Sequence, residues 1–146
     1  MRAKILNASA GSGKTYQLAY KYVRDVIDQP GLYRHILAVT FTNKATEEMK
    51  SRILKEIHRL ASGGASPYLE NLCRELSLDE RSVRKRAAEV RSKILHDYSR
   101  FTVLTIDTFF QRILRAFIKE LGIDLNYNVE IETASVLSKG ADTLIE

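Results

Sequence analysis

The stretch from Ala8 to Thr15, with the letters ASAGSGKT, has the residue types that hold a polyphosphate. Its glycines allow the backbone to curl so that successive N–H groups point inward, and a following helix adds its partial positive charge. Lys14 can then reach the β- and γ-phosphates, and the Thr15 hydroxyl is a ligand for Mg²⁺. We therefore predict an ATP or GTP site, with Mg²⁺ on Thr15 and Lys14 as its catalytic residue, formed by Ala8, Ser9, Ala10, Gly11, Ser12, Gly13, Lys14 and Thr15.

The surroundings of this stretch support the prediction. A short apolar run, Ile5 and Leu6, precedes it, and a helix-like segment, 16–27, follows it. A strand before and a helix after are the context that such a loop requires, so a chance match in a surface loop is the weaker alternative. The usual pattern opens with glycine where this chain has Ala8, and alanine is acceptable there if φ is ordinary.

Composition restricts the class of protein. The 146 residues suit a single domain, and 45% apolar with 28% charged residues is typical of a soluble globular protein. The net charge of +5 fits a nucleic-acid or polyphosphate partner without proving either. The single cysteine, Cys73, and the lack of a signal-like or membrane-spanning stretch lead us to expect a cytoplasmic protein with no membrane partner. His35, His58 and His96 lack the spacing of metal ligands.

Hydrophobic periodicity and turn residues predict the order of the elements. A strand, a helix, a strand, a helix, two further helices, a strand and a helix follow one another, which is typical of a parallel α/β sheet flanked by helices. Gly and Pro clusters at 29–31 and 62–67 separate them. We expect strands at 3–7, 36–40 and 102–106, helices at 16–27, 44–61, 68–76, 79–98 and 108–121, and a tail with an extended piece at 128–132 and a helix at 134–145.

The pattern within these elements predicts which faces are buried. The continuous apolar run 36–40 suits a strand buried on both faces. The helix at 44–61 has an apolar stripe, Ala45, Met49, Ile53, Ile57 and Leu60. The helix at 79–98, begun by Ser77 or Asp79 as cap, has its stripe at Val83, Ala87, Val90, Ile94 and Tyr98. Six cations spread around the rest of this second helix, so we favour a solvated helix over one that contacts DNA.

Two later segments form a set with the phosphate loop. They are ILAVTFTNKATEEMKSRI at 36–53 and VLTIDTFFQRILRAF at 103–117. Together the three segments resemble the start of the UvrD/Rep-type superfamily 1 DNA helicases, most closely their RecB/AddA-like branch. TFTNKA directly after a buried strand is more specific than a phosphate loop alone. The resemblance implies part of a RecA-like P-loop NTPase domain, with a helical insertion.

The resemblance also assigns residues. The first segment implies ATP at Ala8–Thr15. The second and third imply single-stranded DNA against Phe41, Thr42, Asn43 and Lys44 and against Thr105, Asp107, Thr108 and Phe109.

Elementary physics agrees with these assignments, because loops that leave the carboxyl ends of parallel strands gather at one edge of the sheet. Phe41 and Phe109 are then able to stack on bases, and Thr42, Asn43 and Thr108 to donate to phosphates. In the alternative, Phe109 belongs to the packed face of its helix. We expect packing for Phe110, Ile113, Leu114 and Phe117, and leave both roles open for Phe109.

Two departures from the family pattern qualify the resemblance. Asp107 stands where the family often has histidine, and its negative charge opposes contact with a phosphate. The family's apolar strand ending in Asp-Glu, which binds Mg²⁺ and activates the attacking water, is not found in the 146 residues. We therefore expect an N-terminal part of a longer helicase or helicase–nuclease, inactive by itself. Residues 1–122 would be the first part of its ATP-binding domain, with the insertion at about 62–99, and 123–146 the start of a helical accessory region.

The resemblance implies that this helicase works in DNA repair or recombination. Its expected partners are single-stranded DNA, the remainder of the parent chain and a partner subunit of a helicase–nuclease complex. Two alternatives remain. In the first, the chain is a complete small nucleotide or metabolite kinase whose Asp107 binds the magnesium. In the second, it is a regulatory module that binds nucleotide without turnover.

Overall fold

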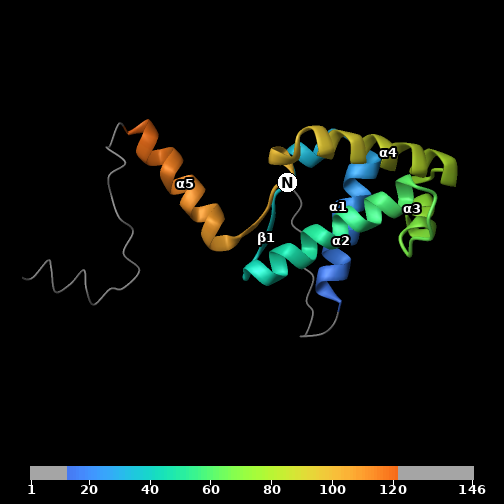
Figure 1. Ribbon diagram of the computed structural model, residues 1–146, viewed down its shortest axis with the longest axis horizontal. Coiled ribbons are helices and arrows are strands. Elements are labelled where there is room, and N and C mark those ends of the chain that lie inside the picture. The colour runs from blue at the N-terminus through green and yellow to red at the C-terminus, as the bar shows by residue number, and fades with distance from the viewer. Residues whose placement is uncertain (1–12, 122–146) are drawn as a thin grey trace, which may run out of the picture. The chain divides into compact units, whose positions relative to one another are not determined.

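The computed structural model describes residues 13–121 (Figure 1). The expected strand at 3–7, residues Ala8–Ser12 of the phosphate loop and the elements expected after residue 122 lie outside the described residues. Contacts divide the chain after Phe109 into two units, residues 1–109 and 110–146, which are described separately. The functional boundary expected at residue 122 stays a prediction.

The element order agrees with the sequence-based expectation throughout the described part of the chain. Each helix and strand expected between residues 16 and 121 is present, with ends shifted by a few residues. The helices are α1 (Lys14–Asp28), α2 (Asn43–Ala61), α3 (Leu69–Leu76), α4 (Glu80–His96) and α5 (Ile106–Glu120), the strands are β1 (Ala38–Thr40) and β2 (Val103–Thr105), and short 3₁₀ turns occur at η1 (Leu32–Arg34) and η2 (Tyr98–Arg100).

Local chemistry explains where the helices begin and end. The Thr42 side chain accepts from Ala45 N at 3.1 Å at the start of α2. Asp79, one of the two expected caps, accepts from Ser82 N at 3.2 Å at the start of α4. The other candidate, Ser77, ends α3 in the left-handed conformation at φ 52°. Each cap satisfies main-chain groups that have no partner within the helix.

The strands β1 and β2 pair in parallel, with Ala38 opposite Val103 and Thr40 opposite Thr105. The Thr40 hydroxyl lies 2.6 Å from the Thr46 hydroxyl of α2, so this face of the sheet turns towards α2. Val39 points to the other face and is 42% exposed. The expectation that the apolar run 36–40 is buried on both faces was therefore wrong for Val39 and for Leu37, which is equally exposed. A run of apolar residues does not say whether a second layer covers both sides.

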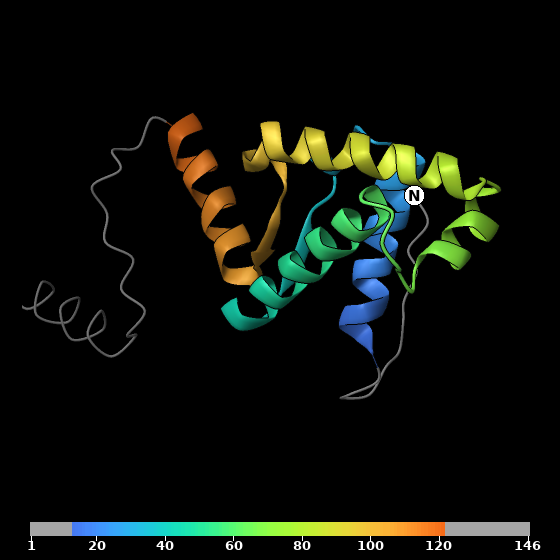
Figure 2. The same cartoon turned by 45° about the vertical axis from the view of Figure 1, so that its right-hand side comes forward.

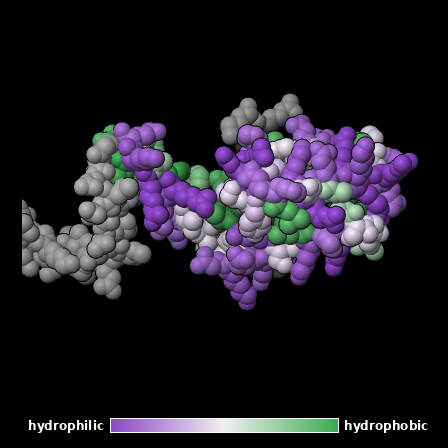
Figure 3. Space-filling view, turned by 45° about the horizontal axis from the view of Figure 1, so that its top comes forward, coloured by the Kyte–Doolittle hydropathy of each residue, from purple (hydrophilic) through white to green (hydrophobic). Residues whose placement is uncertain are grey.

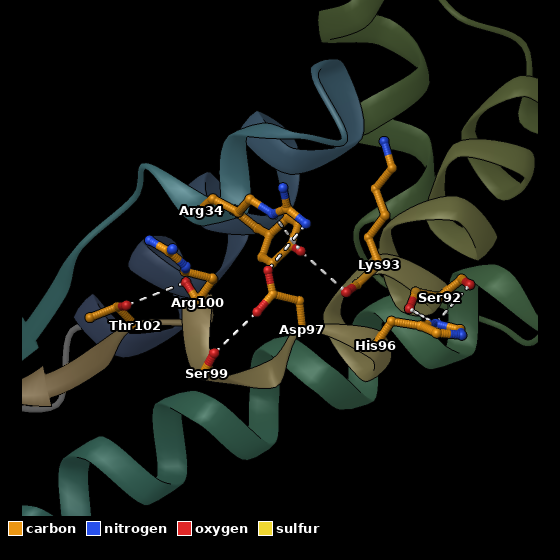
Figure 4. A network of polar contacts seen from close by, with 9 residues as sticks. Arg34, Ser92, Lys93, His96, Asp97, Ser99, Arg100 and Thr102 are labelled. Carbon is orange, nitrogen blue, oxygen red and sulfur yellow. Dashed lines mark hydrogen bonds and ion pairs between the residues drawn. The ribbon is translucent and has the colours of Figure 1, made fainter.

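A polar network joins the segments that precede the two strands, η1 before β1 and η2 before β2 (Figure 4). The buried Tyr33 of η1 donates from its hydroxyl to Lys93 O at 3.2 Å. Its neighbour Arg34 forms an ion pair with Asp97 at 3.1 Å, just before η2. Ser99 donates to the same Asp97 carboxylate at 3.1 Å. Since β1 follows η1 and β2 follows η2, these contacts help to set the parallel register.

The core of the unit 1–109 is formed around α2, which packs against α1 and α4 (Figure 1). The stripe expected on α2 is confirmed at four of its five positions, and Ala45 is only partly buried. Helix α3 closes one end through the buried Leu72. The largest fully buried side chains are Tyr33, Tyr68, Ile27, Ile53, Ile57, Leu60, Leu72, Ile94, Val23, Val26, Val83 and Val90.

Two expectations about α4 need correction. Tyr98 lies beyond the end of the helix in η2 and is half exposed, so the buried stripe ends at Ile94. Two of the cations are not merely solvated. Arg84 donates to Leu60 O and Gly64 O, both at 3.2 Å, and Arg86 donates to Ile27 O and Asp28 O. They neutralise the carbonyl ends of α2 and α1, which carry partial negative charge.

Helix α5 differs from the expectation that its apolar side chains are packed. No residue of α5 is buried, and Phe110, Leu114 and Phe117 are exposed. Of the four α5 residues that were expected to be packed, only Ile113 is partly buried. An amphipathic pattern predicts that a face is to be covered without specifying which element covers it.

The surface of the unit 1–109 is mainly hydrophilic, with a hydrophobic patch on the face shown in Figure 3. None of the helices within residues 13–121 combines the length and the apolar character needed to cross a membrane.

Candidate nucleotide and nucleic-acid sites

The described part of the phosphate loop ends in a left-handed residue. Gly13 has φ 75° and ψ 20°, and it is the N-cap of α1. This conformation costs a residue with a side chain more than it costs glycine. The main-chain oxygen of Gly13 accepts from Gln17 N at 2.9 Å, so the hydrogen-bonded helix starts at the loop itself. The requirement for glycine at this position follows from the backbone.

The first turn of α1 is suited to an anion. Gly13 has no side chain with which to cap the helix, and Lys14, Thr15, Tyr16 and Gln17 include no acidic residue. The first N–H groups of any helix lack carbonyl acceptors one turn earlier, and the helix dipole places partial positive charge at this end. Lys14 is exposed, and Thr15 is partly exposed.

The first turn also fits a magnesium ion bound together with a nucleotide. The Thr15 hydroxyl is a hard oxygen ligand, and Mg²⁺ is usually held by few protein groups, with phosphate oxygens and water completing its shell. Among the described residues no group of three or more His, Cys, Asp or Glu side chains is placed to hold a metal ion by itself.

The exits of the two strands lie at one edge of the sheet. Thr40 and Thr105 are opposite each other in the parallel register, so the segments after them leave on the same side. Figures 1 and 2 show that α1 and α2 also begin on the side towards which β1 runs. Within the unit 1–109, the start of the nucleotide helix and the segment at Phe41 thus occupy one side of the molecule.

Phe41 is the most exposed large hydrophobic residue of the described part, with 85% of its surface accessible. Asn43 and Lys44, in the first turn of α2, are exposed as well. An aromatic ring beside an amide and an ammonium group provides stacking and phosphate contacts without reading sequence. The expectation that Phe41 is accessible after the strand is confirmed.

The hydroxyl oxygen of Thr42 accepts the hydrogen bond that caps α2, so it has a structural role. The main-chain oxygen of Thr42 accepts from the hydroxyls of Thr40 at 3.2 Å and of Thr46 at 3.1 Å. The hydroxyl proton of Thr42 remains able to donate, since a capping hydroxyl uses only a lone pair. These contacts fix the direction in which the chain passes Phe41.

At the end of β2 a threonine again caps the following helix, but here the threonine is buried. Thr105 is only 7% exposed, and its hydroxyl accepts from Thr108 N at 3.2 Å and pairs with the Thr108 hydroxyl at 2.8 Å. Asp107 is exposed and Phe109 is partly buried. Thr105 therefore positions the start of α5 instead of offering its side chain to a ligand.

Sequence reasoning missed one residue near the nucleotide helix. The Tyr68 hydroxyl donates to the main-chain oxygen of Tyr16, two residues after Lys14, at 3.3 Å. The Tyr68 ring lies edge-on to Tyr16 and Tyr20, with centroids 5.0 and 5.2 Å away. Burial raises the pKa of Tyr68 to about 12. The only sequence signal was the pair of tyrosines four residues apart on one face of α1.

With this geometry in place, comparison with known proteins identifies the class of the chain. Residues 2–145 match the family described as UvrD/REP helicase N-terminal domain. The chain belongs to this family.

Curated relatives narrow the similarity to helicase/nuclease subunits. The chain is 30% identical over 128 residues to the RecBCD enzyme subunit RecB of Escherichia coli (strain K12), covering 82% of the chain and 11% of the relative. It is 30% identical over 138 residues to an ATP-dependent helicase/nuclease subunit from Clostridium novyi (strain NT), covering 93% and 10%. The chain thus spans about a tenth of the length of these relatives. No solved structure matches significantly.

Proposed function

We propose that the chain is the ATP-binding start of a DNA helicase of the same kind as RecB and the ATP-dependent helicase/nuclease subunits, with a P-loop fold around residues 8–15. The observation that carries the proposal is the family match over 2–145, which includes the phosphate loop. It is supported by the left-handed Gly13 at the start of α1. The kinase alternative finds no support in these relatives, which are named as RecBCD enzyme or helicase/nuclease subunits.

In the proposed site, the first-turn amides of α1 and the Lys14 ammonium bind the phosphates of ATP, and Thr15 holds Mg²⁺ through its hydroxyl oxygen. The magnesium ion, when bound, would neutralise charge on the phosphate oxygens. Lys14 adds a positive charge beside the β- and γ-phosphates. The chain's contribution is positioning and electrostatic stabilisation, which are the main components of catalysis in phosphoryl transfer.

The same proposal places single-stranded DNA along the edge where the strands end. Phe41 stacks on a base, and Thr42, Asn43 and Lys44 contact the backbone, with Thr108 and Phe109 as further contacts beside them. Thr105 supports this surface from inside, as its burial indicates. The contacts named are to base faces and phosphates, so they would tolerate any sequence.

The wider setting is inferred from the relatives. These relatives are named as a subunit of the RecBCD enzyme and as a subunit of an ATP-dependent helicase/nuclease. We propose that the protein containing this segment translocates on DNA in repair or recombination, in the cytoplasm and together with a partner subunit.

Removing the phosphate-binding lysine tests the nucleotide site. Lys14→Ala should abolish binding of a fluorescent ATP analogue in the presence of Mg²⁺, because it removes the only side-chain cation of the loop. The matched control is Lys85→Ala, an exposed lysine of α4 for which the described residues offer no ion pair. Equal affinity in the wild type and in Lys14→Ala would refute the site assignment.

A further inference from the structure

We infer that Tyr68, on the segment that follows α2, is a positioning residue for the phosphate-binding turn. Its hydroxyl and ring hold the first turn of α1, and thereby Lys14 and Thr15, in the orientation that receives the nucleotide. This inference rests on the proposed function, since it concerns the residue that aligns the same site.

The contacts of Tyr68 converge on the first turns of α1. Its hydroxyl donates to the main-chain oxygen of Tyr16 at 3.3 Å. The rings of Tyr16 and Tyr20 meet the Tyr68 ring at interplanar angles of 76° and 78°, the edge-to-face arrangement that aromatic pairs favour. Tyr16 is separated from Lys14 by a single residue, so the contact acts within the turn that carries the lysine.

Tyr68 is itself rigidly placed. It is 1% exposed, and its main-chain N–H donates to the Ser66 hydroxyl oxygen at 3.2 Å. The Ser66 hydroxyl donates to Glu56 at 2.8 Å, and Arg59 donates to the other oxygen of that carboxylate at 2.7 Å. Glu56 is the one charged residue that is buried among the described residues. The network therefore anchors Tyr68 to the C-terminal half of α2 through the buried Glu56.

A contact from the core to the first turn of a helix limits the motion of that turn. The end turns of helices fray, because their outer groups lack the partners that the middle has. Gly13 adds backbone freedom at this end, and no side chain caps it. A hydrogen bond from a buried hydroxyl to the carbonyl of Tyr16 limits that motion on the side of α1 that faces the core. The first-turn amides then remain aligned for the phosphates.

The test compares two buried tyrosines whose hydroxyls each donate to a main-chain oxygen, in different parts of the unit. Tyr68→Phe keeps the ring and removes only the hydrogen bond to Tyr16. Tyr33→Phe is the control, because Tyr33 is also buried and also donates to a main-chain oxygen, Lys93 O, at 3.2 Å. Its hydroxyl in addition accepts from Arg34 Nε at 3.0 Å, so this variant loses one hydrogen bond more than Tyr68→Phe. Both variants of the 146-residue chain are measured for affinity towards a fluorescent ATP analogue with Mg²⁺, and for amide hydrogen exchange at residues 14–20 without nucleotide.

We expect Tyr68→Phe to weaken nucleotide binding two- to tenfold and to speed exchange in the first turn of α1, while Tyr33→Phe leaves both within twofold of the wild type. A general loss of stability would affect Tyr33→Phe at least as much as Tyr68→Phe, because Tyr33→Phe removes two hydrogen bonds. If Lys14→Ala abolishes binding and Tyr68→Phe binds as the wild type does, the inference is overturned and the proposed function stands. If Lys14→Ala has no effect, the proposed function fails. The exchange comparison needs no nucleotide, so unchanged exchange in Tyr68→Phe overturns the inference even for a chain that binds ATP too weakly to measure.

Discussion

Individual residues at the strand exits divide into those that face solvent and those that hold the backbone. Phe41 is open to solvent, whereas Thr42 and Thr105 use their hydroxyl oxygens to cap helices. Capping explains why a threonine follows or ends each strand, independently of any ligand. The exposed aromatic ring has no such role within the described part, which makes Phe41 the residue best suited to separate binding from folding.

Replacing Phe41 tests the proposed contact with DNA. Phe41→Ala should weaken binding of a fluorescent oligothymidine by about 5- to 150-fold, since stacking of a base on an aromatic ring contributes roughly 1–3 kcal/mol. The free energy of unfolding should change by no more than about 0.5 kcal/mol, because the side chain is exposed. Fluorescence anisotropy and thermal unfolding measure the two quantities.

Leu95→Ala provides the comparison, because it removes an apolar side chain that is 71% exposed on α4. Its affinity for the oligonucleotide should equal that of the wild type. An affinity loss common to both variants, or absent from both, would argue against a stacking role for Phe41.

At the scale of elements, the helix ends show how the sequence defines its own boundaries. Hydrogen bonding to Ser82 lowers the pKa of Asp79, whose carboxylate caps α4. A carboxyl with a lowered pKa in the folded state stabilises the protein at pH values above its unfolded pKa of about 3.9. That contribution is lost as the pH falls through the folded pKa.

Asp79→Asn should therefore alter the acid limb of the stability profile. Asparagine is also a good cap but does not titrate. The wild type should be at least as stable as the variant at neutral pH, and its free energy of unfolding should fall more steeply below about pH 4. Urea unfolding at several pH values measures this, and a difference between the two proteins that does not depend on pH would contradict the prediction.

For the whole molecule, the exposed apolar side chains have consequences in solution. Phe110, Leu114 and Phe117 follow one another at helical spacing on α5, and all three are exposed. Contiguous apolar surface of this kind promotes association. We expect the isolated chain to self-associate as its concentration rises, which sedimentation velocity will detect.

Charged substitutions on that face should reverse the association. The double variant Leu114→Glu with Phe117→Glu should sediment as a smaller species than the wild type at the same concentration. Leu95→Glu, also at an exposed leucine but on α4, should behave as the wild type. A wild type that is monomeric at all concentrations would contradict the prediction.

The local features of this protein could be predicted from the order of its residues. The spacing of apolar residues predicted the helices and strands between residues 16 and 121, and the Asp79 cap was one of two named candidates. The motifs around Phe41 and after Val103 indicated the family to which the chain belongs. These features are readable because helix caps, turns and periodicity depend on residues a few positions apart.

Long-range packing established which of these residues are accessible and which support others. It buried Thr105, left Phe41 and one side of β1 exposed, and directed Arg84 and Arg86 to the carbonyl ends of neighbouring helices. It also brought Tyr68 to Tyr16 across 52 positions of sequence. Contacts at such separation depend on how whole helices pack, and packing depends on the combined shape of many side chains, which no short pattern records.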